Sequence, residues 1–124
     1  MRLLLDTHVA LWWHADHRRL RTPGRRAIAN AAEVWVSAVS AWEVAIKTAL
    51  GKLRPPGPFD EAVEASGFRQ LLVTFRHAAG AGVLPGHHRD PFDRMLVAQA
   101  QLEGLTLVTH DDVFERYGVA VLRV

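Results

Sequence analysis

Short apolar runs alternate along this chain with longer segments in which apolar residues recur every three or four positions. Short apolar runs are typical of buried strands, and a period near 3.6 residues is typical of helices that pack on one face. Gly51 and Gly104 each follow a helical segment, and the proline-rich residues 55–58 indicate a loop. The strands are predicted at 2–5, 33–37, 68–73, 105–109 and 119–122, and the helices at 8–15, 22–32, 40–51, 59–66, 74–81 and 90–103.

Strands and helices alternate throughout this pattern. Crossovers between parallel strands are right-handed and place helices on both faces of the sheet. We therefore expect an α/β fold with three layers, α/β/α, around a mainly parallel central sheet of four to five strands. The length of 124 residues suits one compact core, and no repeat or linker interrupts it, so residues 1–124 are predicted to form a single domain.

Composition limits the setting in which the protein works. Hydrophobic residues make up 49% of the chain, as in a globular protein, and there is no cysteine for a disulfide or a thiolate metal site. No apolar run is long enough to span a bilayer, and Asp6 interrupts the opening run too early for a signal-peptide core. We expect a cytoplasmic protein with no membrane association.

The distribution of charge is more informative than its sum of +2. Arginines cluster near the first helix, whereas several acids recur at predicted strand ends and helix starts. A basic rim beside an acidic pocket suits a phosphate-bearing polymer held next to metal ions. A solvated helix face explains the arginine run equally well. The clustered arginines are Arg18, Arg19, Arg21, Arg25 and Arg26.

Four acids that are distant in sequence are predicted to meet at one edge of the sheet. Asp6 and Asp111 follow predicted strands, whereas Glu43 and Asp93 are predicted in the first turns of helices. Parallel sheets place their sites outside the carboxyl ends of the strands, where these helices also begin. Because crowded carboxylates repel one another, a divalent cation such as Mg²⁺ would stabilise them and could activate water for phosphodiester hydrolysis.

Each acid also has a purely structural explanation. Asp6 can cap the first helix, and Ser40 with Glu43 fits a capping box, with Lys47 one turn further on as an ion-pair partner. Asp93 suits the helix dipole. Two helical rows favour a site nevertheless: Asp93 shares one with Val97 and Ala100, and Glu43 shares one with Ile46 and Leu50, so both acids border a predicted apolar stripe.

Aromatic and histidine side chains add little to this picture. Trp12 and Trp13 suit either base stacking or, preferably, packing, and Trp35 and Trp42 are predicted in the core. The pair His87 and His88 lacks a recognised zinc spacing, so contact with substrate or solvent is the preferred interpretation.

Four segments together resemble PIN-domain nucleases, in particular the VapC-type toxins of toxin–antitoxin systems. The first is the strand ending in Asp6-Thr7-His8, and the second is the serine- and glutamate-containing helix. The third contains Asp90-Pro91-Phe92-Asp93, and the fourth ends at Asp111. In sequence numbers the segments are 3–8, 36–53, 88–100 and 107–111, so the resemblance spans nearly the whole chain.

The resemblance implies a PIN-like fold and an endoribonuclease that depends on Mg²⁺ or Mn²⁺. It also implies an RNA substrate, an inhibitory antitoxin partner and a homodimer. Thr7 matches the hydroxyl residue beside the first acid. Asp90 competes with Asp93, and Asp112 with Asp111, for a place at the metal. The catalytic and metal-binding acids implied by the resemblance are Asp6, Glu43, Asp93 and Asp111.

Two alternatives remain open at this stage. One is a phosphatase or phosphoryl-transfer enzyme that uses Asp6 as nucleophile, although His8 stands where a second aspartate is usual. The other is a catalytically inactive module that binds RNA or an antitoxin.

Overall fold

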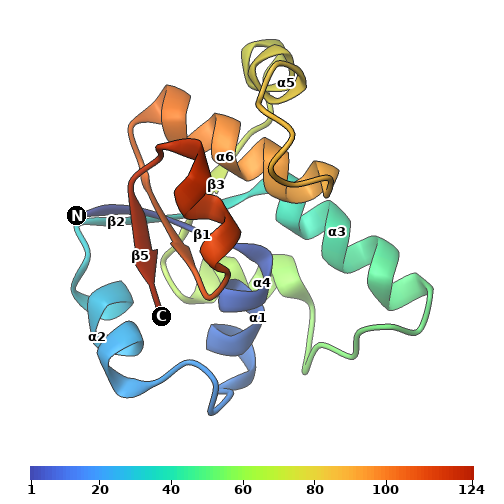
Figure 1. The fold of residues 1–124 in the computed structure, drawn as a ribbon. Helices are drawn as coiled ribbons and strands as arrows, with labels where there is room; N and C mark the ends of the chain where they lie inside the picture. Colours follow the sequence, from blue (N-terminus) through green and yellow to red (C-terminus); the bar gives the residue numbers. More distant parts are fainter.

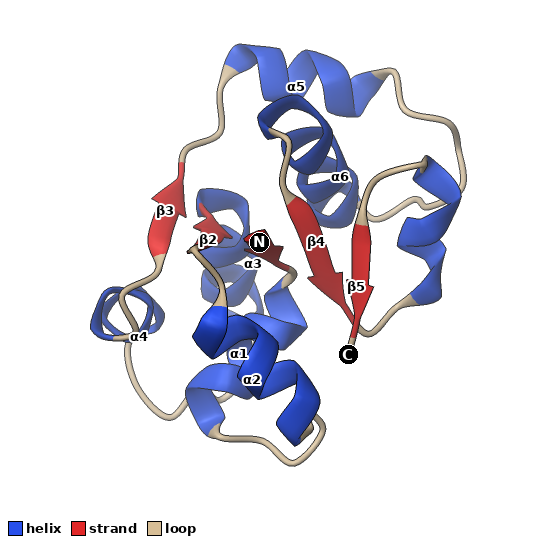
Figure 2. Cartoon of the chain, turned by 90° about the vertical axis from the view of Figure 1, so that its left-hand side faces the viewer, coloured by secondary structure: helices blue, strands red, loops and turns tan.

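A five-stranded, fully parallel sheet runs through the middle of the computed structural model, which describes residues 1–124 (Figures 1 and 2). The strand order is β3-β2-β1-β4-β5, so the first strand is central. In the register of the sheet, Leu4 is paired with Trp35 on one side and with Leu107 on the other. The strands are β1 (Arg2–Leu5), β2 (Glu33–Ser37), β3 (Arg69–Leu71), β4 (Thr106–Thr109) and β5 (Val121–Arg123).

Helices cover both faces of this sheet, as Figure 2 shows. Helices α1, α2 and α4 lie on one face, and α5, α6 and η1 lie on the other. Helix α3 packs against both α1 and α6. The helices are α1 (Thr7–Ala15), α2 (Thr22–Asn30), α3 (Ala38–Ala49), α4 (Phe59–Ala65), α5 (Phe75–Gly82), α6 (Pro91–Glu103) and the 3₁₀ helix η1 (Asp112–Tyr117).

The core is divided in two by the alternation of side chains along β1. Leu3 and Leu5 pack with apolar residues of α1, α2 and α4, whereas Leu4 packs with α6 and η1. All three leucines are fully buried, as expected for a central parallel strand covered on both faces. The predicted three-layer architecture and the mainly parallel sheet are therefore confirmed, and the single-domain organisation stays a prediction. None of the helices combines the length and apolarity needed to cross a membrane.

Helix α3 differs from the prediction in where it begins. It starts at Ala38, directly after β2, and the Ser37 hydroxyl caps it by accepting a hydrogen bond from the Val39 amide (3.0 Å). The predicted capping box of Ser40 with Glu43 is therefore wrong, because both residues lie inside the helix.

Trp42 also differs from the prediction. The buried residues of α3 are Val39, Ser40, Glu43 and Val44, so Trp42 lies off the buried stripe. It is 62% exposed, and its ring meets Phe92 edge-on at 5.4 Å between centroids. The prediction of a core Trp42 is wrong.

Candidate active site

Asp6 lies immediately after β1 and begins α1. Its Oδ1 accepts a hydrogen bond from the Val9 amide (2.8 Å), and its Oδ2 accepts one from the Thr109 hydroxyl at the end of β4. The residue is only 6% exposed. Burial raises the pKa of the Asp6 carboxyl above its usual range, against the opposing effect of the Thr109 hydrogen bond.

Glu43 projects from the second turn of α3, not from the first turn as predicted. Its Oε1 accepts a hydrogen bond from the Thr7 hydroxyl (2.7 Å), whose oxygen also lies 2.9 Å from Oγ of Ser40. Its Oε2 lies 2.6 Å from Nζ of Lys47, so the predicted ion pair is confirmed. That bond with Glu43 raises the pKa of the Lys47 ammonium. Glu43 is thus a buried carboxylate compensated by one cation.

The expectation that both helical acids border a buried apolar stripe holds for Asp93 but not for Glu43. Val97 and Ala100 are buried beside Asp93, as expected. Leu50 is 63% exposed, so the row that Glu43 shares with it is not the buried one. Glu43 is buried because its side chain lies against α1, where it meets the Thr7 hydroxyl.

Asp90 and Asp93 open α6 with different partners. Oδ1 of Asp90 accepts hydrogen bonds from the amides of Phe92 (2.8 Å) and Asp93 (3.2 Å), which is the N-cap role expected for it. Oδ2 of Asp93 lies 2.6 Å from Nε2 of His88. Burial and then the negative charge of Asp90 raise the pKa of the Asp93 carboxyl from 3.8 to about 7.

Asp111 is connected to Asp6 through one hydroxyl. The Asp111 amide donates to Oγ1 of Thr109 (3.1 Å), whose proton goes to Asp6. The Asp111 carboxylate caps η1 by accepting from the Val113 amide (3.0 Å). Asp6, Asp111 and Asp112 line one open hollow in the surface.

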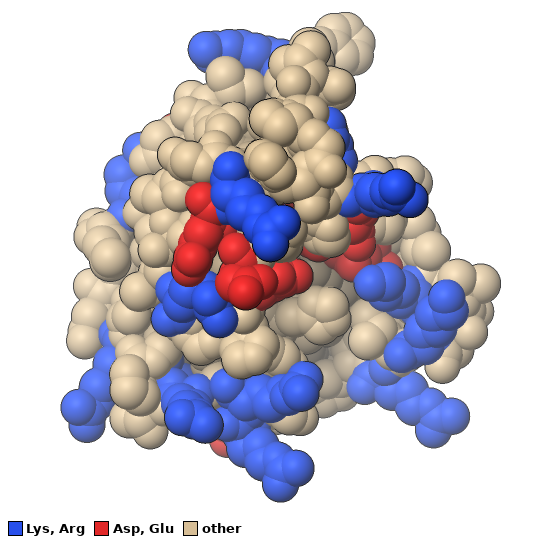
Figure 3. Space-filling model, viewed as in Figure 1, with Lys and Arg blue, Asp and Glu red and all other residues tan.

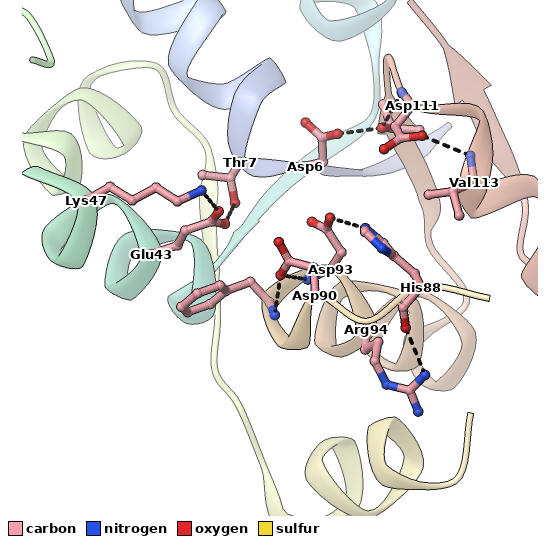
Figure 4. Close-up of polar contacts among 12 residues, drawn as sticks. Asp6, Thr7, Glu43, Lys47, His88, Asp90, Asp93, Arg94, Asp111 and Val113 are labelled. Carbon is pink, nitrogen blue, oxygen red and sulfur yellow. Dashed lines mark hydrogen bonds and ion pairs between the residues drawn. The ribbon is translucent and has the colours of Figure 1, made fainter. Parts of the chain in front are cut away.

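The predicted acids therefore gather on one side of the molecule (Figures 3 and 4). In Figure 4, Asp6, Asp90, Asp93 and Glu43 reach the same region from β1, α6 and α3. Figure 3 shows acidic side chains in the middle of one face with basic side chains bordering them. The charge of Glu43 acts on Asp6, and that of Asp6 acts on Asp93.

The gathered acids do not form a complete set of metal ligands. No three histidine, aspartate or glutamate side chains lie close enough together to hold a metal ion as they stand. Three of the acids have protein partners instead: the hydroxyl of Thr109 donates to Asp6, the Lys47 ammonium pairs with Glu43, and the His88 ring lies against Asp93.

The chemistry of these donors nevertheless fits a hard divalent cation. All the candidate ligands are carboxylate oxygens, which Mg²⁺ and Mn²⁺ prefer over other protein groups. Burial raises the pKa of both Asp6 and Asp93, which means that their negative charges are poorly solvated where they lie. A cation among them would remove that penalty.

A model of the PIN domain family matches residues 3–120 of the chain. The chain belongs to the PIN domain family. The resemblance drawn from the sequence motifs is confirmed.

Relatives of this PIN domain include a curated ribonuclease. Ribonuclease VapC22 of Mycobacterium tuberculosis (strain ATCC 25618 / H37Rv) is 36% identical over 112 residues, which cover 88% of this chain and 86% of that protein. The fold is similar to that of a DNA-bound VapBC from Salmonella typhimurium (TM-score 0.73, 21% identity, 99% and 98% of the two chains). It is also similar to a toxin-antitoxin complex from Klebsiella pneumoniae (TM-score 0.63, 18% identity, 88% and 86%).

Three side chains of the PIN domain site were missed by sequence reasoning. Thr109 joins Asp6 to Asp111, His88 pairs with Asp93, and Arg94 supports the segment that carries His88. The guanidinium of Arg94 donates to four backbone carbonyls, those of Ala81 (2.9 Å), Leu84 (2.9 Å), Pro85 (2.9 Å) and His88 (3.3 Å). Only the adjacent histidines gave a signal in the sequence, and it was interpreted as contact with substrate or solvent.

Proposed function

We propose that this chain is a metal-dependent endoribonuclease, the toxin of a toxin–antitoxin pair, that hydrolyses RNA phosphodiester bonds. The observation that carries the proposal is the gathering of buried and half-buried acids from β1, α3 and α6 on one side of a PIN domain. The 36% identity to a protein named as a ribonuclease supports the same activity.

Asp6, Glu43, Asp93 and Asp111 are the residues proposed to hold Mg²⁺ or Mn²⁺. Such a cation, when bound, lowers the pKa of an attacking water and stabilises negative charge on the scissile phosphate. Asp90 and Asp112 have cap or surface positions and remain the competing candidates.

The surrounding residues prepare the carboxylates for that task. The Thr7 hydroxyl and the Lys47 ammonium fix the position of the Glu43 carboxylate. The Thr109 hydroxyl fixes Oδ2 of Asp6. His88 holds Oδ2 of Asp93 in the same way, so each acid has a partner that fixes its orientation.

The partners in this proposal are an RNA strand, an antitoxin protein and a second copy of the chain. The VapBC and toxin-antitoxin neighbours support the antitoxin. A cytoplasmic location is part of the same proposal. The phosphatase alternative lacks the second aspartate that is usual two residues after such a nucleophile, because His8 stands at that position.

The test is incubation of the purified protein with a pool of structured RNAs, with Mg²⁺ or with excess chelator. We expect cleavage only with the metal, and a loss of at least about 100-fold in Asp6→Asn and Asp93→Asn, because even outer-shell partners of a metal contribute about 10–100-fold. Asp90→Asn keeps the cap and should retain most activity. The exposed Glu64→Gln is the control for a lost negative charge. Cleavage that survives Asp6→Asn or the chelator would refute the mechanism.

A further inference from the structure

The hollow beside Asp6 is lined by basic and aromatic side chains as well as by acids. Its lining includes Trp12, Arg19 and His110 as well as the acids already described. A second hollow, about 540 Å³ in volume, is lined by Arg18, Arg19, Arg21, His110 and Val124. Because the two hollows share Arg19 and His110, they adjoin each other, and we call the two together the depression, with carboxylates in the first hollow and arginines in the second.

Trp12 organises the middle of this depression. The Arg19 guanidinium carbon lies 5.7 Å from the centre of the Trp12 ring, within cation–π range. The His110 ring meets the same indole edge-on at 5.6 Å, and His17 stacks on it at 6.2 Å. Nδ1 of His110 lies 2.7 Å from the Val124 carbonyl oxygen and donates to it, which leaves Nε2 free.

The arginines here are not neutralised by carboxylates. Arg18, Arg19 and Arg21 are exposed, and none of them forms an ion pair with a carboxylate. Arg25, by contrast, pairs with Asp16 (3.0 Å) and donates to the His17 carbonyl (2.9 Å), which fixes the turn that carries them. We call Arg18, Arg19, Arg21 and His110 the arginine strip.

We propose that the arginine strip binds the phosphodiester groups of the RNA strand next to the bond held at the carboxylates. This inference rests on the proposed function and adds the direction of the strand: from Asp6 past Trp12 toward residues 18–21. A polyanion cannot rest on the acidic end of the depression without a cation, whereas the arginine end offers uncompensated positive charge to its neighbouring phosphates.

The chemistry of the strip also sets what kind of selectivity it provides. Guanidinium groups contact phosphates whatever the base, so the strip contributes affinity and register but no sequence preference. Binding through it depends strongly on salt, because each neutralised phosphate of a single strand changes log K by about 0.7 per decade of salt.

The experiment measures binding without cleavage. Fluorescence anisotropy of a fluorescein-labelled, 12-nucleotide single-stranded RNA of mixed sequence is recorded in chelator across a series of NaCl concentrations. The parent is compared with Arg19→Ala/Arg21→Ala and with the control Arg54→Ala/Arg76→Ala, which removes two exposed arginines outside both hollows. Cleavage of the RNA pool in Mg²⁺ is measured in parallel.

We expect the strip variant to lose about 1.4 from its salt slope, and hence to bind about 25-fold more weakly at 0.1 M salt, one decade below the 1 M reference. The control should bind within twofold of the parent.

Equal effects of the two double variants, or no RNA binding by the parent, would overturn the proposal. So would a strip variant that keeps its RNA affinity and instead loses binding to a deca-glutamate peptide, since the strip would then serve an acidic protein partner. If the strip variant loses RNA binding and the parent does not cleave RNA, the proposed function is contradicted, whereas the role of the arginine strip stands.

Discussion

Asp93→Asn should make the protein more stable at neutral pH while disabling its site. Burial and the nearby charge of Asp90 raise the pKa of Asp93 from 3.8 to about 7. Between these two values the folded protein keeps a proton that the unfolded chain has released. The free energy of unfolding therefore falls as the pH rises from about 4 to about 7, and asparagine, which does not titrate, avoids that loss.

The size of the effect follows from the shift. Each pKa unit corresponds to about 1.36 kcal/mol, so the rise from 3.8 to about 7 sets an upper limit of about 4 kcal/mol. Between pH 5 and pH 8, the folded and unfolded chains differ in the protonation of Asp93 over about two pH units, from pH 5 to about pH 7. The stability gap between Asp93→Asn and the parent should therefore widen by about 3 kcal/mol in favour of the variant.

Urea unfolding in chelator at pH 5 and pH 8 measures this gap. Glu64→Gln, which removes an exposed carboxylate, should show no such change with pH. Adding Mg²⁺ at pH 8 should stabilise the parent by about 2.7 kcal/mol at a hundredfold excess over its dissociation constant, and the variant less. A stability gap of equal size at both pH values would refute the claim that ionisation of the crowded Asp93 carboxyl destabilises the folded protein.

Three further substitutions test individual contacts. Thr109→Val removes the donor to Asp6 and should cost about 1–3 kcal/mol in urea unfolding and about 10–100-fold in RNA cleavage. Arg94→Lys cannot reach four carbonyls with one ammonium, so hydrogen exchange should quicken in residues 81–88, whereas unchanged protection would contradict the bracing role. Lys47→Met leaves the buried Glu43 carboxylate without its cation and should lower the free energy of unfolding in urea by about 3 kcal/mol. Adding Glu43→Gln should restore most of that loss, and no recovery would point to lost packing instead.

Sequence alone predicted those elements whose limits are fixed by local chemistry. Helix α6 begins with the Asp90 cap and Pro91 and ends at Gly104, where φ is +66° and a side chain would be strained. The central strand was equally clear, since its three leucines are apolar without alternation, as burial on both faces requires.

The start of α3 was harder because two serines compete for the cap. Ser40 sits three residues before Glu43, which matches a capping box, but the chain leaves β2 and enters the helix at once. Val39 favours a strand locally, and only the packing of α3 between α1 and α6 overrides it. The exposure of Trp42 depends on which side of α3 packs inward, and that side carries Val39, Ser40, Glu43 and Val44.

The partners of the acids were beyond sequence reasoning for a different reason. Thr109 reaches Asp6 because β4 lies next to β1 in the sheet, with Val108 paired to Leu5. Neither the strand order nor the register can be deduced from the pattern of one chain. The contact of His88 with Asp93 likewise depends on a loop conformation that Arg94 stabilises from the following helix.

Three aspartates in this region serve local folding as well as electrostatics: Asp6 caps α1, Asp90 caps α6 and Asp111 caps η1. Asparagine keeps an oxygen that accepts from the same amides, whereas alanine discards it, at a penalty of about 1 kcal/mol per helix. Alanine scanning would consequently confuse a weakened fold with a lost reaction, and amide scanning would separate the two. The same duality makes Asp6→Asn a natural choice for preparing an intact but inert form of the protein in living cells.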